Sequence, residues 1–420
     1  MPGHGDLGMN GALPHVVHVI STIDPRAGGT TTQLVTLVRA QVQLGLSVTV
    51  VSTYAQGFDP TAAEEINNAG VRLELVGPGT QIAGWHPKIS PVLRDVLATA
   101  DVVHIHGLWE EIQHRAAVIA REMRCKYLFT LHGTLEPWAV QQSRMKKQIY
   151  MAVRMRKNLN TASALHYTDD TERELTRDWG LTATAIIQPY AIDLAAFEQM
   201  PSRGLFRRAF RQLADAPYVL FLGRLHPRKG LELLLEAFAG LPQTLKHVKL
   251  VIAGPSAQQG YEAELYAEAI KLKISDRVIF AGALEGNLRA AAYADAAVFA
   301  LPSRSPGFGS TVIEALACGA RVVVSSHVAV SRQIQTAGVG RVVGDDVNAW
   351  SAALADTLRE SMENAAPVDG TEDVTRRGRD WVMESFNAKA CALSWATMYD
   401  QIIQGTLDAN ARLNITPAAV

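Results

Sequence analysis

The feature that most constrains the fold is a regular alternation of short β-branched stretches with longer amphipathic ones. The first series of short stretches reads HVVHVIS (15–21), SVTVVST (47–53), VRLELV (71–76), DVVHIH (101–106), KYLFTLH (126–132), ALHYT (164–168) and TAIIQPYAIDLAAF (184–197). Apolar residues between them recur at helical spacing, as Leu34, Leu37 and Val38 do. Strands that alternate with helices predict a parallel sheet whose two faces are covered by helices.

The pattern restarts after residues 198–215, an Arg- and Ala-rich segment that we expect to be a linker. The second series reads YVLFLGR (218–224), KLVIAG (249–254), RVIFAG (277–282), AAVFALPS (296–303), RVVVSS (321–326) and VGRVVG (339–344). We therefore predict an α/β protein with two Rossmann-like, doubly wound parallel-sheet domains, 15–197 and 216–374, that face a central cleft. Residues 1–14 are expected to be a flexible N-terminus. The helical segment 375–420 is expected to pack back across the cleft.

The composition is that of an ordinary globular protein. Its 420 residues are 48% hydrophobic and carry a formal net charge of −1, which argues against a general nucleic-acid-binding protein because such proteins need a basic excess. The scattered cysteines, Cys125, Cys318 and Cys391, are expected to be core thiols rather than disulfides or metal ligands. The first residues lack the pattern of a signal peptide, and no apolar run is long enough for a membrane span, so we expect a cytoplasmic protein.

One group of candidate functional residues lies in FLGRLHPRKGLELLLEAF (221–238). A predicted strand ends at Arg224, a proline turn follows, and Lys229 comes just before an amphipathic helix. Two cations beside the free amides of a helix N-terminus suit a diphosphate group. The alternative is that both are ordinary solvated loop residues.

A second group lies in SRSPGFGSTVIEALACGARVV (303–323). Gly307 and Gly309 permit a turn in which the backbone comes close to a ligand. The peptide amides at the predicted helix start belong to Ser310, Thr311 and Val312. Glu314 follows in an otherwise apolar helix, where a carboxylate needs a partner, and it could accept two ribose hydroxyls. Alternatively, Glu314 is only stabilised by the helix dipole.

The order of these motifs resembles a known enzyme family. GR-x-x-x-x-KG, VIAG, RVIFAG and PS-x-x-x-GFG-x-x-x-x-EA follow one another along the second half of the chain. In the first half, a GG turn after the first strand, HIHG (104–107) and LHG (131–133) also match. The chain is similar to the retaining glycosyltransferases of family 4, which have the two-domain GT-B fold, and the likeness spans most of its length.

The resemblance implies roles for particular residues. Arg224 and Lys229 would bind the donor diphosphate, Glu314 the ribose hydroxyls and His132 the donor sugar, and these four are the candidate catalytic residues. Further donor-binding positions would be Gly28, Gly29, Gly254, Ala283, Leu284, Gly307, Phe308, Gly309, Ser310, Thr311 and Val312. The acceptor would meet His106, Trp109 and His132.

Two departures from the family pattern stand out. The position eight residues before Glu314, where the family usually has an acidic residue that contacts the transferred sugar, is Pro306. Proline offers neither a side-chain acceptor nor an amide. The usual P-N-G-V-D is here PYAID (189–193), so Tyr190 and Ala191 also depart from the pattern.

The resemblance implies retaining transfer of a sugar from a nucleotide-diphosphate sugar, with UDP favoured, to a glycan or lipid-linked acceptor in polysaccharide or glycoconjugate synthesis. The sequence contains no D-x-D motif, and Arg224 and Lys229 can replace a metal ion, so we expect no metal and no cofactor. Pro306 motivates the alternative of a catalytically silent sugar-nucleotide-binding or scaffolding protein. A nucleotide-sugar epimerase fits the motifs less well.

The stretch SRMKKQIYMAVRMRKNLN (143–160) is basic and amphipathic. On a helix, Met145, Ile149 and Ala152 share a side. One interpretation is a surface helix whose charges are solvated. The other is peripheral contact with an anionic membrane that presents a lipid-linked acceptor.

Overall fold

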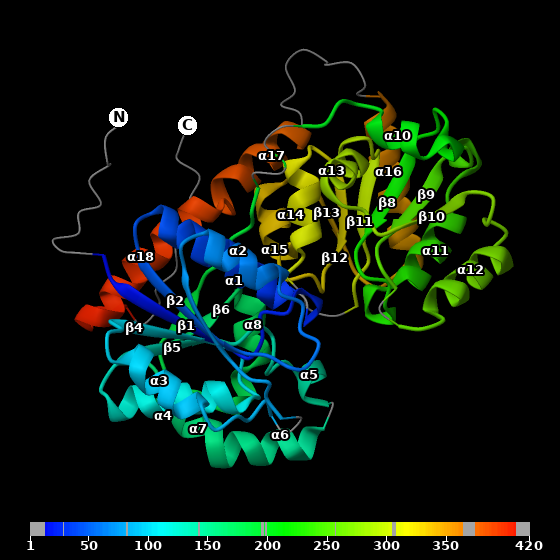
Figure 1. The fold of residues 1–420 in the computed structure, drawn as a ribbon. Coiled ribbons are helices and arrows are strands. Elements are labelled where there is room, and N and C mark those ends of the chain that lie inside the picture. Colours follow the sequence, from blue (N-terminus) through cyan, green and yellow to red (C-terminus); the bar gives the residue numbers. More distant parts are fainter. Residues whose placement is uncertain are drawn as a thin grey trace, which may run out of the picture. The chain divides into compact units, whose positions relative to one another are not determined.

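The computed structural model describes residues 13–27, 29–80, 83–141, 143–194, 197, 200–256, 258–304, 308–363 and 374–408. The chain forms two compact units (Figure 1). Unit 1 extends to Ile192 and includes the helix that begins at Ala388, and unit 2 comprises Asp193–Asn387. Each unit contains one parallel sheet with helices on its faces, so the predicted fold class of two Rossmann-like domains is confirmed.

The sheet of unit 1 has the strand order β3-β2-β1-β4-β5-β6-β7. Its strands are β1 (His15–Ile20), β2 (Ser47–Thr53), β3 (Arg72–Val76), β4 (Val102–His106), β5 (Lys126–Thr130), β6 (Ala164–Tyr167) and β7 (Ala185–Ile187). Each lies within a stretch that the sequence pattern predicts. The order reverses between β1 and β4, and doubly wound sheets bind ligands beyond the carboxyl ends of their strands at such a point.

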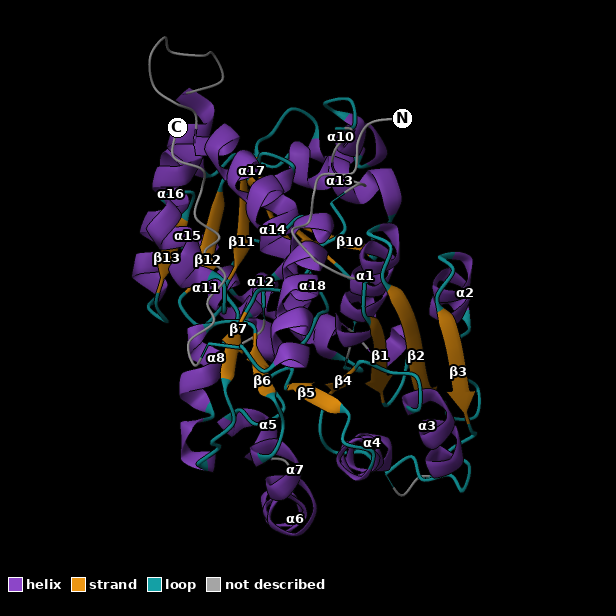
Figure 2. Ribbon diagram, turned by 90° about the vertical axis from the view of Figure 1, so that its left-hand side faces the viewer, coloured by secondary structure: helices purple, strands orange, loops and turns teal. Residues whose placement is uncertain are grey.

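Strand register gathers polar side chains on one face of this sheet. His18 of β1 pairs with His104 of β4, and Thr130 of β5 pairs with both His106 and His166. Since side chains two residues apart point to the same face of a strand, His104 and His106 project together. Helices α1 (Gly29–Gln43) and α18 (Ala388–Gln404) lie side by side over this face (Figure 2).

Apolar side chains fill both faces of the sheet, which explains why its strands are almost continuously hydrophobic. The other helices of unit 1 are α2 (Thr61–Asn68), α3 (Ile89–Leu97), α4 (Glu111–Glu122), α5 (Pro137–Gln141), α6 (Arg144–Tyr150), α7 (Arg156–Asn160) and α8 (Asp170–Leu175). A π-helical turn, Met151–Met155, joins α6 to α7. Within the described ranges, no helix combines the length and apolarity that a membrane crossing requires.

The sheet of unit 2 has the strand order β10-β9-β8-β11-β12-β13 and reverses between β8 and β11. Its strands are β8 (Tyr218–Leu222), β9 (Lys249–Ala253), β10 (Val278–Gly282), β11 (Val298–Leu301), β12 (Val322–Ser325) and β13 (Arg341–Val343). Its helices include α10 (Leu205–Ala209), α11 (Leu231–Ala239), α12 (Tyr261–Lys271), α13 (Gly286–Ala294), α14 (Ser310–Ala317), α15 (Ser331–Ala337), α16 (Val347–Glu363) and α17 (Val374–Ser385).

Two segments belong to the units in a way that the sequence pattern does not define. The amides of Gly204 and Phe206, in the segment expected to be a linker, donate to the carboxylate of Asp295. This segment is therefore part of unit 2. The C-terminal helices separate: α17 packs against α14 in unit 2, whereas α18 packs against α1 in unit 1.

Candidate functional site

In unit 2, the loop between β8 and α11 carries the predicted cationic pair. Arg224 follows the strand and is exposed, and Lys229 ends a short 3-10 turn directly before the helix. Gly230 has a φ of 69°, and an added Cβ would lie 2.1 Å from the carbonyl oxygen of Pro302. Only glycine allows this loop to pack so closely against the chain that leaves β11.

The same contact brings the two predicted motifs of unit 2 together. The amide of Arg304 donates to the carbonyl of Arg228 at 2.8 Å, and the Ser303 hydroxyl donates to that carbonyl at 3.3 Å. Residues 302–304 lead toward α14, so the cationic loop and the predicted phosphate-binding turn share the carboxyl edge at the β8–β11 reversal.

The electrostatics of this edge favour an anion. Burial, together with the positive charges of Arg224 and Arg228, lowers the pKa of Lys229 to about 8. Among the described residues, neither Arg224 nor Lys229 has a carboxylate partner. An anionic ligand would relieve this repulsion between like charges.

The start of α14 matches the prediction in part. Gly309 precedes the helix with a φ of 85°, and an added Cβ would lie 2.5 Å from Val328. The predicted amides of Ser310 and Thr311 are in the first turn, but the amide of Val312 donates to the Gly309 carbonyl at 2.8 Å. Val312 therefore cannot offer its amide to a phosphate, because the helix cap already uses it.

The other predicted residues of this turn are placed unevenly. Gly307 and Pro306 lie outside the described residues, as does Gly28 in unit 1. The ring of Phe308 packs edge-on against Phe386, with centroids 5.9 Å apart. This contact identifies Phe308 as a packing residue in this structure.

Glu314 is buried and already has partners. Its Oε2 accepts from Tyr293 at 2.9 Å and from Arg289, both on α13. Burial raises the pKa of the Glu314 carboxyl, and the Arg289 charge opposes that rise. The partner that an acid in an apolar helix needs is therefore protein. Arg289 and Tyr293 are residues that the sequence reasoning missed, since no motif marks them.

Three glycines let the strand ends of unit 2 approach one another. Gly254 has a φ of 134°, its amide donates to the Gly282 carbonyl at 2.7 Å, and an added Cβ would lie 1.9 Å from the Gly223 carbonyl oxygen. Next to them, Ala283 is exposed and Leu284 is buried. Ala283 is thus accessible to a ligand at this edge.

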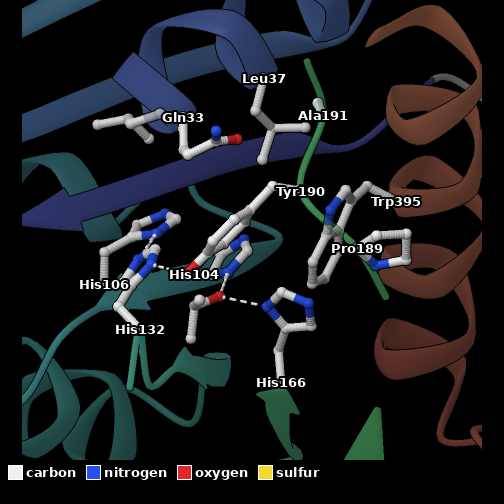
Figure 3. A pocket seen from close by; sticks show the side chains of 12 residues that line it. Gln33, Leu37, His104, His106, His132, His166, Pro189, Tyr190, Ala191 and Trp395 are labelled. Carbon is white, nitrogen blue, oxygen red and sulfur yellow. Dashed lines mark hydrogen bonds between the residues drawn. The ribbon is translucent and has the colours of Figure 1, made fainter. Parts of the chain in front are cut away.

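Unit 1 contains a pocket over the polar face of its sheet (Figure 3). It is lined by Gln33, Leu34, Leu37, His104, His106, Thr130, His132, His166, Pro189, Tyr190, Ala191 and Trp395. The residues come from α1, from the carboxyl ends of β4, β5 and β6, from the segment after β7 and from α18. Two of the three predicted acceptor residues, His106 and His132, therefore line one pocket.

His132 adopts the left-handed backbone conformation, with a φ of 53°. Such conformations in non-glycine residues persist only where the surroundings hold them, and they are frequent at functional sites. Buried Glu172 provides that support, because it accepts the amides of Gly133 at 2.6 Å and Thr168 at 2.7 Å. Glu172 was also missed from the sequence.

The imidazoles of this face are hydrogen bonded to each other and to their neighbours. His132 lies 2.6 Å from the Tyr190 hydroxyl and 3.1 Å from His106, and the rings of these pairs are stacked. Tyr190, one of the departures from the family pattern, is therefore the direct partner of His132. Desolvation lowers the pKa of His132 to about 3 and those of His18 and His166 to about 4.

Three of these rings could in principle bind a metal. Ligand atoms of His18, His104 and His106 lie within 4.8 Å of one another. Each of their ring nitrogens, however, already has a hydrogen-bond partner between 2.6 and 3.1 Å away. A metal would have to replace these bonds, so the donor set fits a hydrogen-bond network better.

Two predicted residues of unit 1 lie outside the pocket. Trp109 donates to the Thr134 carbonyl at 3.3 Å, packs on Tyr150, and has the Lys147 ammonium 5.3 Å from its ring centre. Its predicted role of stacking on an acceptor sugar is thus replaced by packing beneath α6. Gly29 is exposed at the start of α1.

Comparison with known families accounts for most of the chain. Residues 203–379 match the model "Glycosyl transferases group 1", and residues 28–190 match "Glycosyl transferase 4-like domain". The two matched segments correspond to the cores of unit 2 and unit 1.

Curated relatives include D-inositol 3-phosphate glycosyltransferase of Xylanimonas cellulosilytica, 30% identical over 226 residues, or 50% of this chain and 52% of the relative. GDP-mannose-dependent alpha-(1-6)-phosphatidylinositol monomannoside mannosyltransferase of Mycolicibacterium smegmatis is 29% identical over 224 residues, or 51% and 56%. The matches thus span about half the length of these relatives. A phosphatidylinositol N-acetylglucosaminyltransferase polypeptide of Arabidopsis thaliana is 24% identical over 85% of this chain and 76% of that protein.

Solved structures share the fold. Anabaena Alr3699/HepE, solved in complex with UDP and glucose, superposes with a TM-score of 0.71 at 17% identity and covers 92% of this chain and 100% of that chain. Sucrose-phosphate synthase from Thermosynechococcus elongatus gives 0.67 at 22% identity, with 93% and 100% covered. The fold is therefore GT-B. With both family models matched, the chain belongs to the GT4-type glycosyltransferases.

The buried histidines predict a pH dependence of stability. Their folded pKa values of about 4, 3 and 4 lie below the unfolded value of 6.5, so the unfolded chain binds more protons in between. The free energy of unfolding of unit 1 should therefore fall as the pH drops from about 6.5 to about 4. In His166→Gln this slope should decrease by about 1.4 kcal/mol per pH unit.

Urea unfolding at pH 7 and pH 5, followed by tryptophan fluorescence, measures this slope. His247→Gln, at an exposed position of unit 2, serves as the control and should leave the slope of unit 1 unchanged. An equal slope in His166→Gln and wild type would show that His166 does not stay neutral in the folded protein.

Proposed function

We propose that the protein transfers a sugar from a nucleotide-diphosphate sugar to a hydroxyl acceptor, with retention of anomeric configuration. The observation that supports this most is the cationic edge of unit 2. There Arg224 and Lys229, without carboxylate partners among the described residues, lie on the loop that packs against the chain leading to α14. The family membership supplies the reaction class.

The reaction breaks the bond between the anomeric carbon and the diphosphate oxygen and forms one between that carbon and the acceptor oxygen. Negative charge grows on the leaving diphosphate, which Arg224, Lys229 and the amides of Ser310 and Thr311 would stabilise more strongly in the transition state than in the ground state. We propose front-face attack, in which the leaving phosphate oxygen takes the acceptor's proton.

Glu314 has a modified role in this proposal. Arg289 and Tyr293 occupy its Oε2 and hold the carboxylate in one orientation, so the ribose hydroxyls would be read by an acid that is already fixed. His132 would contact the sugar from the pocket of unit 1. Charge-assisted hydrogen bonds, such as those a carboxylate accepts from hydroxyls, are the stronger ones in proteins.

A donor panel with charge-removal variants tests the proposal. UDP-sugars are the first arm, and GDP-mannose is the second because one relative is named for its dependence on it. We expect release of the nucleoside diphosphate only when acceptor is present. Arg224→Ala and Lys229→Ala should each weaken diphosphate binding roughly tenfold or more, measured by isothermal titration.

Matched controls are available in unit 2. Arg211→Ala removes an exposed arginine, and Lys246→Ala removes a half-buried lysine; neither should change nucleotide affinity. Affinity unchanged in Arg224→Ala and Lys229→Ala would refute their role. Binding without turnover for every donor and acceptor would instead support the catalytically silent alternative.

We propose that transfer needs no divalent metal, because two side-chain cations and helix amides can stabilise the leaving group and the sequence has no D-x-D motif. Activity should persist within about twofold after EDTA treatment and dialysis. Loss of activity with EDTA and its recovery with Mg²⁺ would contradict this part of the proposal.

The helical segment 144–160 supports a second element, peripheral membrane contact. Met145, Ile149 and Val153 are 73%, 59% and 77% exposed, whereas the opposite side of the segment is buried. The exposed row extends the predicted one across the π-helical turn, which shifts the phase of the helix there. Large exposed apolar side chains in a row indicate an interaction surface.

The charges on this segment indicate the partner. Residues 143–160 contain six basic residues and no acidic one, and Arg144, Lys146 and Lys157 are exposed. An apolar row flanked by cations complements an anionic lipid surface. We propose that unit 1 docks there and that the acceptor is lipid-linked; relatives named for phosphatidylinositol substrates are consistent with such an acceptor.

Liposome sedimentation tests this contact. The triple variant Met145→Ser, Ile149→Ser, Val153→Ser should lose binding to vesicles containing anionic phospholipid by about tenfold or more. The variant Tyr266→Ser, Ile270→Ser removes two exposed apolar side chains of α12 in unit 2 and should bind as wild type does. No binding of the wild-type protein at low salt would rule the contact out.

A further inference from the structure

A continuous series of hydrogen bonds crosses the polar face of unit 1. It begins at the main-chain carbonyl of Gln188, which can only accept, and His166 Nε2 donates to it at 2.8 Å. The bare Nδ1 of neutral His166 then accepts from the Thr130 hydroxyl at 2.9 Å. Because that hydroxyl has one proton, its oxygen must accept from His104 Nε2, which is 2.6 Å away.

The direction continues through the two covering helices. His104 Nδ1 accepts from the Tyr399 hydroxyl at 2.8 Å, and the Tyr399 oxygen accepts from Gln41 Nε2 at 3.2 Å. This orients the Gln41 amide, so its Oε1 accepts from His18 Nε2 at 2.9 Å. The bare Nδ1 of His18 accepts in turn from His106 Nε2 at 2.9 Å.

The last links reach the pocket. His106 Nδ1 accepts from His132 Nε2 at 3.1 Å, and His132 Nδ1 accepts from the Tyr190 hydroxyl at 2.6 Å. Burial keeps the five rings neutral, since it lowers the pKa of each one. One carbonyl at the far end therefore determines the tautomer of every ring, and each carries its proton on Nε2.

The pocket wall contains one more acceptor. Gln33 of α1 points into the pocket (Figure 3), and its Oε1 is buried without a hydrogen-bond partner among the described residues. A buried acceptor without a partner is costly, so a ligand that donates to it gains affinity. With Gln33 Oε1 and His132 Nδ1 both acceptors, the pocket favours a hydroxyl over a carboxylate or phosphate.

We propose that the unit 1 pocket receives a hydroxyl of the sugar substrate as a hydrogen-bond donor to Gln33, and that the chain from Gln188 to His132 sets this acceptor polarity. The inference rests on the proposed glycosyl transfer. His18, Gln41, His104 and Tyr399 are then positioning residues, which act through His106 on His132.

The tautomers are measured without any activity. Long-range ¹H–¹⁵N correlation spectra of ¹⁵N-histidine-labelled full-length protein at pH 7 should show Nε2-protonated, neutral rings for His18, His104, His106, His132 and His166. A ring protonated on Nδ1 or on both nitrogens would overturn the chain. So would Zn²⁺ at stoichiometric amounts if it shifted the resonances of His18, His104 and His106 together.

Variants of Gln41 test the coupling to His132. Gln41→Leu removes both links, and we expect mixed tautomers at His106 and His132 with a roughly tenfold lower kcat/KM. Gln41→Glu should be protonated in this buried site and reproduce the amide's acceptor and donor, which should restore the tautomers and bring kcat/KM within about threefold of wild type. Unchanged tautomers in Gln41→Leu would overturn the coupling.

Gln33 is tested by kinetics with a matched control. Gln33→Leu should raise the KM for the sugar donor roughly tenfold with little change in kcat, whereas Gln43→Leu, at an exposed position of the same helix, should not. Equal KM values would refute the role of Gln33. If no donor is turned over by the wild-type protein, the proposed function fails, while the tautomer spectra still decide the chain.

Discussion

Desolvation of imidazole rings is the constraint on which unit 1 depends. The strands β1, β4, β5 and β6 place histidines on one face of a sheet whose two faces are buried, and a buried imidazolium without an anionic partner is too costly. The rings therefore stay neutral, and each nitrogen needs a partner of the right kind. Gln41 and Tyr399, from the two helices that cover the face, supply the partners that the strands lack. Packing of α18 on α1 is thus part of the polar network as well as of the apolar core.

Unit 2 depends on a different constraint, the close approach of backbones at the carboxyl ends of its strands. Gly230 against Pro302 and Gly254 against Gly223 are contacts that any Cβ would prevent. These contacts bring the cationic loop next to the chain that leads to α14. The two units therefore prepare opposite environments by the same topology: one end of a reversed parallel sheet collects cations, and the other collects neutral acceptors.

The Glu314 site shows how structural and functional demands can be met by one residue. An acid in an apolar helix suggested a ligand, yet Arg289 and Tyr293 satisfy its Oε2 within the protein. Tyr190 offers a parallel case, because a departure from the family pattern turns out to be the group bonded to His132. In both cases the partner lies on an element far along the chain from the motif. Sequence spacing carries no signal of such partners.

The sequence by itself determined the thirteen strands, their division into two parallel sheets and the membership of Arg224, Lys229, His106 and His132 in candidate sites. These features follow from local periodicity and from motifs at strand ends, which depend on residues close in sequence. The tertiary structure decided what touches what: the pairing of Glu314, the packing of Trp109 and Phe308, the roles of Glu172 and Gln33, and the placement of α17 and α18 in different units. Such contacts join residues up to hundreds of positions apart, and only burial and register determine which of them meet.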